Sequence, residues 1–173
     1  RVVVVEGNGE PEIFLPPGFA NILEDQFADL DQVSRAAGFI AGGLITNTEA
    51  NLAFRESDIS FVEGDFFETF SFPIKRGNAD LSNPQSAVIS QKLATKLFGE
   101  SDALGKNFTL SNNFGKSDFT VSGVLDEIPL RSDIRSEVFL SIHYLENEAN
   151  RNGNNWADPN GMDSGFTNLY LLT

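Results

Sequence analysis

The stretch that decides the fold is residues 84–125, which read PQSAVISQKLATKLFGESDALGKNFTLSNNFGKSDFTVSGVL. It opens with a short apolar run at 87–89, which predicts a strand. Ser90 follows, and its hydroxyl can cap a helix by accepting from the first free backbone amides. The apolar residues of the next segment share one face of a helix over 91–98: Leu93, Ala94, Leu97 and Phe98. Phe98 ends this face and is expected to be a core anchor.

Gly99 is expected to end the helix, because glycine takes the left-handed conformation at little cost. Two segments of alternating pattern follow, joined by a turn at Asn-Asn-Phe-Gly (112–115). The positions expected to be buried are Phe108, Leu110, Phe119, Val121, Gly123 and Leu125. This alternation predicts a hairpin with one buried face, so the whole stretch is expected to be a βαββ unit.

Residues 99–106, GESDALGK, resemble a nucleotide-binding loop only superficially. They place one residue more between the two glycines than a phosphate loop has, and Asn107 stands where a Ser or Thr would bind magnesium. The loop also follows a helix C-terminus, where carbonyl groups and the negative end of the helix dipole repel an anion. We therefore predict a structural turn and no cofactor.

The same region resembles the extracytoplasmic (periplasmic core) domain of ABC transporter permeases of the MacB/FtsX type. The resemblance rests on FFETFSFPIKRGN (66–78), LSNPQSAVISQKLATKLFGESDALGKNFTL (81–110) and FTVSGVLDEIP (119–129), which occur in the family's order. Further on, Trp156 in a polar loop and the LYLL run at 169–172 also match the family. The resemblance extends over nearly the whole chain and is weakest over 1–16.

The resemblance implies an α+β fold with two subdomains. A discontinuous, porter-like α/β subdomain would comprise 1–78 plus 131–173, and a smaller α/β subdomain, 79–130, would be inserted into it. The shift of pattern near Asn78 and the return of strands after Arg131 favour the same division.

The resemblance also implies a function. Family members hold this domain outside the cytoplasmic membrane of bacteria, between two membrane helices, and transmit motions driven by a separate cytoplasmic ATPase. The implied partners are that ATPase, reached through the membrane helices, and a periplasmic protein or an exported substrate. The full-length protein is expected to be dimeric in the membrane, and no residue is assigned to a catalytic, cofactor or metal site.

Composition excludes several other functions. The net charge of −13 and the pI near 4.3 would repel nucleic acid and anionic membrane surfaces. The absence of cysteine removes disulfides, zinc-thiolate sites and thiol nucleophiles. No apolar run approaches the roughly 18 to 20 residues that span a bilayer, and no signal peptide is present. Because the chain starts at Arg1 directly before an apolar run, we expect an excised part of a longer protein.

The N-terminal half is expected to contain a strand at 2–5, a turn at 7–11 and an amphipathic helix starting at Pro17. The helix is expected to bury one face: Phe19, Ile22, Leu23, Phe27 and Leu30. Two or three strands are expected within 33–46 and 49–63, with a bend at the glycines Gly38, Gly42 and Gly43 and a turn at 47–48. The aromatic segment 65–72 predicts a short helix that wedges Phe side chains between two layers.

The C-terminal half is expected to begin with a turn at 76–78. After the βαββ unit, 126–137 is expected to be a crossover loop, 138–142 a strand and 143–148 a short helix. A long polar loop at 150–165 leads to a last strand at 166–172. The two terminal apolar segments, 2–5 and 166–172, are expected to lie side by side in one sheet, because both would continue into one bilayer.

The chain offers little for enzymatic chemistry. His143 is the only histidine, and no Gly-x-Ser-x-Gly motif presents a serine to it. The calcium-like oxygens of Asn154, Asp158, Asn160 and Asp163 lack the spacing of a calcium loop. The 25 acidic residues make carboxylate pairs by chance. We predict that the protein is not an enzyme. The alternatives are a free-standing extracytoplasmic module that binds a ligand or glycan and, less favoured, a hydrolase with a carboxylate pair.

Overall fold

The structure is a computed structural model that describes residues 2–4, 14–27, 29–38, 40–100, 102–126 and 135–172. The strands in these ranges are β1 (Val2–Val4), β2 (Gln32–Ala37), β3 (Gly43–Asn47), β4 (Leu52–Glu56), β5 (Ile59–Val62), β6 (Ile74–Gly77), β7 (Ser86–Ser90), β8 (Asn107–Asn112), β9 (Gly115–Leu125), β10 (Val138–Ser141) and β11 (Asn168–Leu172). The helices are α1 (Phe19–Gln26), α2 (Phe66–Thr69) and α3 (Gln91–Phe98), with 3-10 turns η1 (Ile142–Glu146), η2 (Glu148–Arg151) and η3 (Asn155–Ala157). The expected α+β class is confirmed.

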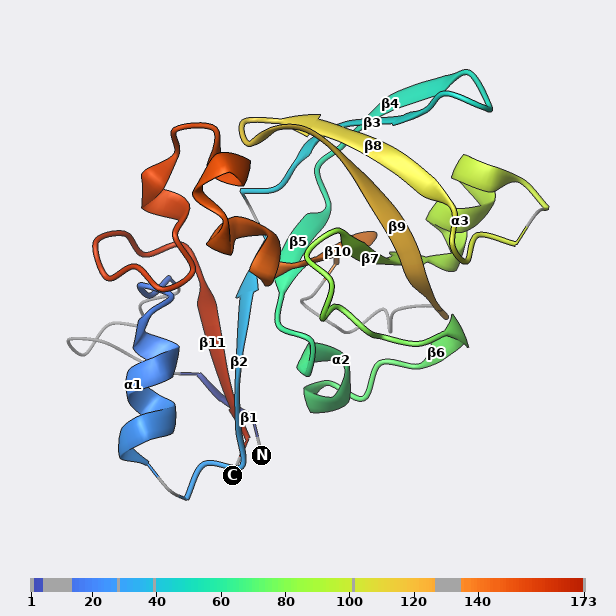
Figure 1. Ribbon diagram of the computed structural model, residues 1–173. Helices are drawn as coiled ribbons and strands as arrows, with labels where there is room; N and C mark the ends of the chain where they lie inside the picture. Colours follow the sequence, from blue (N-terminus) through green and yellow to red (C-terminus); the bar gives the residue numbers. More distant parts are fainter. Residues whose placement is uncertain are drawn as a thin grey trace.

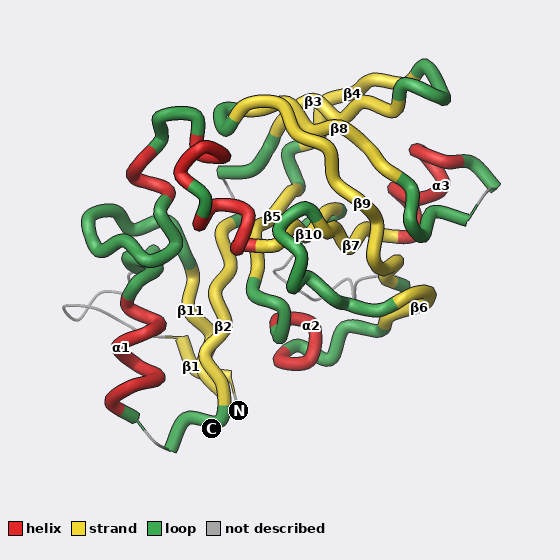
Figure 2. The backbone as a smooth tube through the Cα atoms, in the orientation of Figure 1, coloured by secondary structure: helices red, strands yellow, loops and turns green. Residues whose placement is uncertain are grey.

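The strands form a strongly mixed sheet in the order β1-β11-β2-β5-β10-β7-β9-β8-β3-β4, with β6 paired to β9 (Figure 1). The pairs β5–β10 and β7–β9 are parallel, and the remaining pairs are antiparallel. Figure 2 shows β1, β2 and β11 side by side at the end of the molecule that carries α1, and β3, β4 and β8 together at another end, with α2 between the two groups.

The predicted βαββ unit is confirmed. The Ser90 hydroxyl accepts a hydrogen bond from the Leu93 amide at 3.0 Å, and Gly99 ends α3 with a φ of +65°. Strands β8 and β9 pair as the expected hairpin, with Phe108 opposite Phe119. The expectation that Phe98 is a core anchor is correct only in part. Leu97 is buried in the core, whereas Phe98 is half-buried and packs against the margin of that core.

Helix α1 differs from its expected apolar face. Ala20 and Leu23 are buried, whereas Ile22 and Phe27 are 37% and 53% exposed. The helix ends at Gln26, so Phe27 has left the helical path before it could return to the buried side. The spacing that placed Phe27 on one face applies only as long as the helix continues.

The strands in 32–63 number four, β2 to β5, where two or three were expected. The glycines at 38 and 42 lie in the break between β2 and β3. The turn at 47–48 is confirmed, because the Asn47 side chain accepts hydrogen bonds from the amides of Glu49 and Ala50.

The expected turn at 76–78 is wrong in part, because Arg76 and Gly77 belong to β6. A Cβ on Gly77 would lie 2.3 Å from the Ser122 carbonyl oxygen, so glycine permits this close pairing with β9.

Aromatic residues fill the space between α2 and the sheet, as expected for 65–72. Phe66, Phe67 and Phe72 are buried against Phe139 of β10.

The strand expected at 138–142 is β10, and the short helix expected at 143–148 is a set of 3-10 turns. The expected turn at 7–11 and most of the expected crossover loop, 127–134, lie outside the described residues. No helix in the described ranges is long and apolar enough to cross a membrane.

Candidate functional site at the sheet junction

The first and last strands of the chain pair with each other. β1 and β11 are antiparallel, with Val2 opposite Leu172 and Val4 opposite Tyr170. The N and C labels lie next to each other at one end of the molecule (Figure 1). This confirms the expectation that the two terminal segments lie side by side in one sheet.

These two strands belong to a small unit that we call the base, made of β1, β11, β2 and α1. β11 pairs with β2 along five residue pairs, and α1 packs on this part of the sheet. The base has its own apolar cluster: Leu15, Ala20, Leu23, Val33, Leu169 and Leu171. Helix α1 and strands β2 and β11 thus share one apolar cluster.

The base joins the rest of the molecule, which we call the body, through a narrow seam. β2 pairs with β5 at only two residue pairs, Ala36 with Val62 and Ala37 with Phe61. Since few ladder hydrogen bonds cross this seam, side-chain contacts must supply much of its stiffness.

An ion pair lies beside the seam. Arg35 of β2 is 7% exposed, and its guanidinium donates to the carboxylate of Glu63, which directly follows β5. A second guanidinium nitrogen donates to the carbonyl of Pro159, and the Glu63 amide donates to the Arg35 carbonyl at 3.1 Å. The pair thus ties together β2, the end of β5 and the polar loop of 150–165. Such a planar, forked cation suits several acceptors at once.

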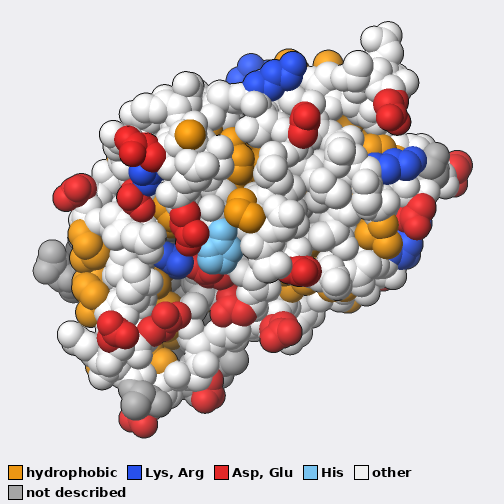
Figure 3. Space-filling model, in the orientation of Figure 1, with side chains coloured by type: hydrophobic (Ala, Val, Ile, Leu, Met, Phe, Trp, Pro, Cys, Tyr) orange, Lys and Arg blue, Asp and Glu red, His pale blue; other side chains and the backbone are white. Residues whose placement is uncertain are grey.

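His143 approaches the same carboxylate from η1. Its Nε2 lies 3.9 Å from Glu63 Oε2, and its Nδ1 lies 2.8 Å from Glu146 Oε1. Figure 3 shows the histidine among acidic side chains on an open face. Within the described residues, its hydrogen-bond and ionic partners are carboxylates, so the geometry supplies no hydroxyl nucleophile for it to activate.

The acidic character of this region also affects Glu24 of α1. Burial raises the pKa of Glu24 above its ordinary value, the nearby charge of Arg35 opposes this, and the charges of Glu63 and Asp65 add to the rise. Helix α1 is thus electrostatically connected to the junction, by which we mean the β2–β5 seam and the Arg35–Glu63 pair beside it.

An aromatic contact completes the junction. Tyr170 of β11 packs edge-on against two phenylalanine rings. The distance between ring centroids is 4.8 Å to Phe70 and 6.2 Å to Phe66. Phe66 opens α2 and Phe70 directly follows it, and both pack in the cluster that contains Phe139, so the contact links the base to that core. Edge-to-face pairs of this kind hold aromatic rings in a defined orientation.

Sequence reasoning missed Arg35 and Glu63. The available signal was a lone arginine inside an otherwise apolar or small-residue strand, QVSRAA. An arginine is almost never buried without a partner, so its position in β2 called for an acidic residue on a neighbouring strand.

The polar loop of 150–165 uses its oxygens within the protein. Asp158 Oδ2 lies 2.8 Å from Arg151 Nη1, and Asp158 Oδ1 accepts from the Asn160 amide at 2.9 Å. The Asn160 hydrogen bond and the Arg151 charge lower the pKa of Asp158 despite burial. Within the described residues, no three His, Asp or Glu side chains converge as metal ligands would.

Solved structures share this fold. They are a domain of a protein described as a permease from Porphyromonas gingivalis (TM-score 0.77, 20% identity, 99% of this chain and 74% of that one), the periplasmic region of MacB from Actinobacillus actinomycetemcomitans (0.65, 16%, 98% and 72%) and the extracellular domain of the noncanonic ABC-type transporter YknZ from Gram-positive bacteria (0.59, 16%, 99% and 81%). No curated protein matches the chain.

The fold is therefore that of an extracytoplasmic domain of a transporter permease. The chain belongs to the family of MacB-like periplasmic core domains, whose model matches residues 2–170. It is a periplasmic or extracellular domain of a MacB-type membrane transporter, and the resemblance read from the sequence is confirmed. Family membership places it in the context of an ABC transporter with its ATPase.

Proposed function

We propose that this domain is a non-catalytic lever that transmits ATPase-driven conformational change across the membrane to a periplasmic substrate or partner. The observation that carries the proposal is the antiparallel pairing of β1 with β11, which brings the two chain ends together. Membrane helices attached at both ends would grip the same two strands, and a shift between them would act on the base as a whole.

The junction would convert that shift into a movement of the body. A two-pair seam bends more easily than the five-pair β2–β11 ladder, so the base and body can change their relative orientation while each keeps its fold. The Arg35–Glu63 pair and the Tyr170 contacts lie where such bending would occur. The full-length protein would work as a dimer with a cytoplasmic ATPase.

Distance measurements in the full-length permease test this proposal. The chain has no cysteine, so cysteines placed at exposed Asp25 in α1 and exposed Lys116 in β9 carry the only spin labels in this domain. We expect the distance between the labels to differ between ATP-bound and nucleotide-free states. A control pair at Glu100 and Lys116, both in the body, should not change.

One outcome would overturn the proposal. If the membrane helices move on ATP binding while the Asp25–Lys116 distance stays constant, the junction does not act as a hinge. A change in the control pair would instead place the movement inside the body.

We also propose that 79–130 forms a unit of its own, inserted into the porter-like part made of 1–78 and 131–173. Its support is the complete arrangement of β7, α3, β8 and β9 in chain order. Most of the buried apolar residues of this unit pack in one cluster with Ile45, Phe61 and Leu140 of the porter-like part. Hydrogen bonds cross the boundary at β7–β10 and β3–β8, so the proposal concerns cooperative unfolding and not a separate sheet. Hydrogen exchange should show β7, β8 and β9 opening together, and exchange of these strands at unrelated rates would contradict it.

A further inference from the structure

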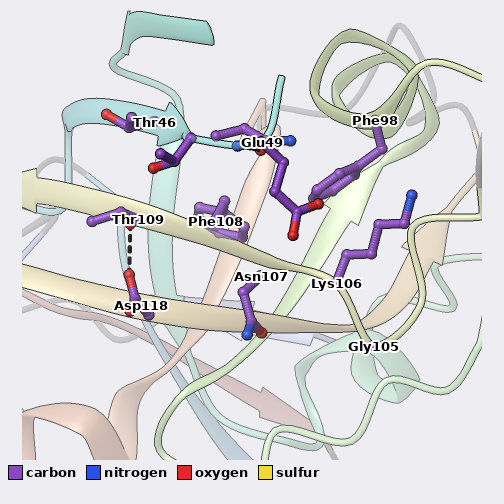
Figure 4. A pocket seen from close by; sticks show the side chains of 11 residues that line it. Thr46, Glu49, Phe98, Gly105, Lys106, Asn107, Phe108, Thr109 and Asp118 are labelled. Carbon is purple, nitrogen blue, oxygen red and sulfur yellow. Dashed lines mark hydrogen bonds between the residues drawn. The ribbon is translucent and has the colours of Figure 1, made fainter. Parts of the chain in front are cut away.

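A groove lies where β3 and β8 stop pairing. Their ladder ends at Thr46 opposite Thr109, although β3 continues to Asn47 and β8 begins at Asn107. The separated strands leave a space of about 350 Å³, shown in Figure 4. The lining residues that bear on binding are Glu49, Phe98, Lys106, Phe108, Thr109 and Asp118.

One end of the groove is aromatic. Phe108 is buried beneath it, and Phe98 at the C-terminal end of α3 is only half-buried. The Lys106 ammonium lies 5.3 Å from the centre of the Phe98 ring. The Phe98 ring is thus partly accessible from the groove, with the Lys106 ammonium near one of its faces.

The rim carries hydrogen-bonding groups of both kinds. Glu49 and Lys106 project toward the Phe98 end, and Thr109 and Asp118 lie at the other end, joined by a 2.5 Å hydrogen bond (Figure 4). In the part of the chain that the structure describes, the side chains of Glu49 and Lys106 make no hydrogen bond or ion pair. Both are therefore available to a ligand.

The rim is fixed before any ligand arrives. Asn47 is 6% exposed, and its Nδ2 donates to the Leu97 carbonyl at 2.8 Å. Its Oδ1 accepts from the amides of Glu49 and Ala50 at 3.1 and 3.2 Å. One buried side chain thus holds the start of the β3–β4 turn against the end of α3, which reduces the ordering cost of binding.

The mixture of groups selects the class of ligand. An anion would meet Glu49, Asp118 and a protein of net charge −13, whereas a cation would compete with Lys106 at the aromatic end. A neutral sugar ring suits both features, since its C–H face can stack on Phe98 while its hydroxyls meet the carboxylates and the ammonium. The volume of about 350 Å³ is at the small end of ligand pockets and suits roughly one or two sugar rings.

We propose that this groove binds a neutral pyranose unit of an extracytoplasmic glycan. Phe98 provides the stacking face, and Glu49, Lys106 and Asp118 select the hydroxyl groups. The inference does not depend on the proposed lever motion, because the groove lies entirely within the body.

Nuclear magnetic resonance titration of the 173-residue chain with chitobiose, the disaccharide of N-acetylglucosamine, tests the proposal. We expect saturable shifts confined to the lining residues, with a dissociation constant of about 0.1 to 10 mM. Glu49→Gln and Lys106→Gln should each weaken binding by about tenfold, because each loses a charged hydrogen-bond partner. Glu100→Gln, an exposed acidic residue outside the lining, is the matched control and should bind as the parent does.

The probes distinguish the alternatives. Maltose binding at the same residues would support a general neutral-sugar site, and co-sedimentation with insoluble cell-wall glycan would identify the polymer as the source. Groove shifts with argininamide or phosphate but not with chitobiose or maltose would overturn the proposal in favour of an ion site. An absence of groove shifts at about 50 mM of either sugar, several times the weakest expected dissociation constant, would also overturn it.

Discussion

Leu97 and Phe98 are neighbours on α3, yet the fold uses them differently. Leu97 is 1% exposed in the main core, whereas Phe98 lies at its margin and lines the groove. Size alone would have made Phe98 the more important residue for stability. The extent to which a side chain leaves water decides its contribution.

Substitution of the two residues should reverse the order that their sizes suggest. Leu97→Ala should lower the free energy of unfolding by about 3 kcal/mol, because it leaves a cavity in the core. Phe98→Ala should cost about 1 to 2 kcal/mol, because the side chain is only partly buried at the margin of the core. Urea unfolding measures both values. A loss for Phe98→Ala that equals or exceeds the loss for Leu97→Ala would contradict the assigned burial.

Glu137 gives a pH-dependent prediction at the same scale. Burial raises the pKa of this carboxyl, but hydrogen bonds from Lys92 and Ser90 outweigh that effect, so its pKa is lowered below 4.5. A lowered folded-state pKa stabilises the protein above the unfolded-state pKa, and the stabilisation disappears as the pH falls through the folded-state pKa.

Glu137→Gln should therefore lower the free energy of unfolding at pH 7 by about 0.5 to 1 kcal/mol, a modest value because Lys92 is 82% exposed. The difference from the parent should shrink as the pH is taken well below 4.5. Lys92→Met should show a smaller effect, since the Ser90 hydrogen bond remains. A constant difference between parent and Glu137→Gln at all pH values would exclude this charge as the cause.

At the scale of elements, the junction depends on a charge pair that joins β2 to the end of β5. Burial of one ion without its partner costs far more than burial of the pair. The Arg35 guanidinium also holds the Pro159 carbonyl, so three segments lose a common partner if it is removed.

Arg35→Met should lower the free energy of unfolding by about 3 to 5 kcal/mol, because Glu63 is left buried without its cation. The double variant with Glu63→Leu should recover a substantial part of this loss. Urea unfolding of the two single variants and the double variant gives the coupling energy directly. Additive losses would show that the two side chains act independently.

The elements that the sequence indicated best are those with local causes. The start and end of α3 depend on Ser90 and Gly99. Ser90 lies directly before the helix and Gly99 directly after it. Strand β6 was missed because Gly77 reads as a turn residue, and only its pairing with β9 gives it an extended role. Partners far along the chain decide such strands.

At the scale of the whole molecule, the absence of a nucleotide site remains a prediction. Loop 99–106 follows the C-terminal end of α3, and Lys106 lies over Phe98 rather than among free backbone amides. The purified chain should show no saturable ATP binding in calorimetry, because this location favours cations over phosphates. Saturable binding that is lost in Lys106→Ala would contradict the prediction.

The sequence by itself determined the α+β class, the βαββ unit, the aromatic wedge of α2 and, through ordered motifs, the family. These features depend on short-range periodicity, caps and turns, which the chain displays residue by residue. The family resemblance added the expectation that the terminal strands meet.

Only the tertiary structure decided the functional geometry. The pairing of Arg35 with Glu63, the two-pair seam between β2 and β5, and the groove beside Phe98 each join segments that lie far apart in the chain. Periodicity tells which side of an element is apolar, but not which other element covers it or where two strands part. The position of Phe98 at the edge of the core and the exposure of Phe27 follow from that non-local packing.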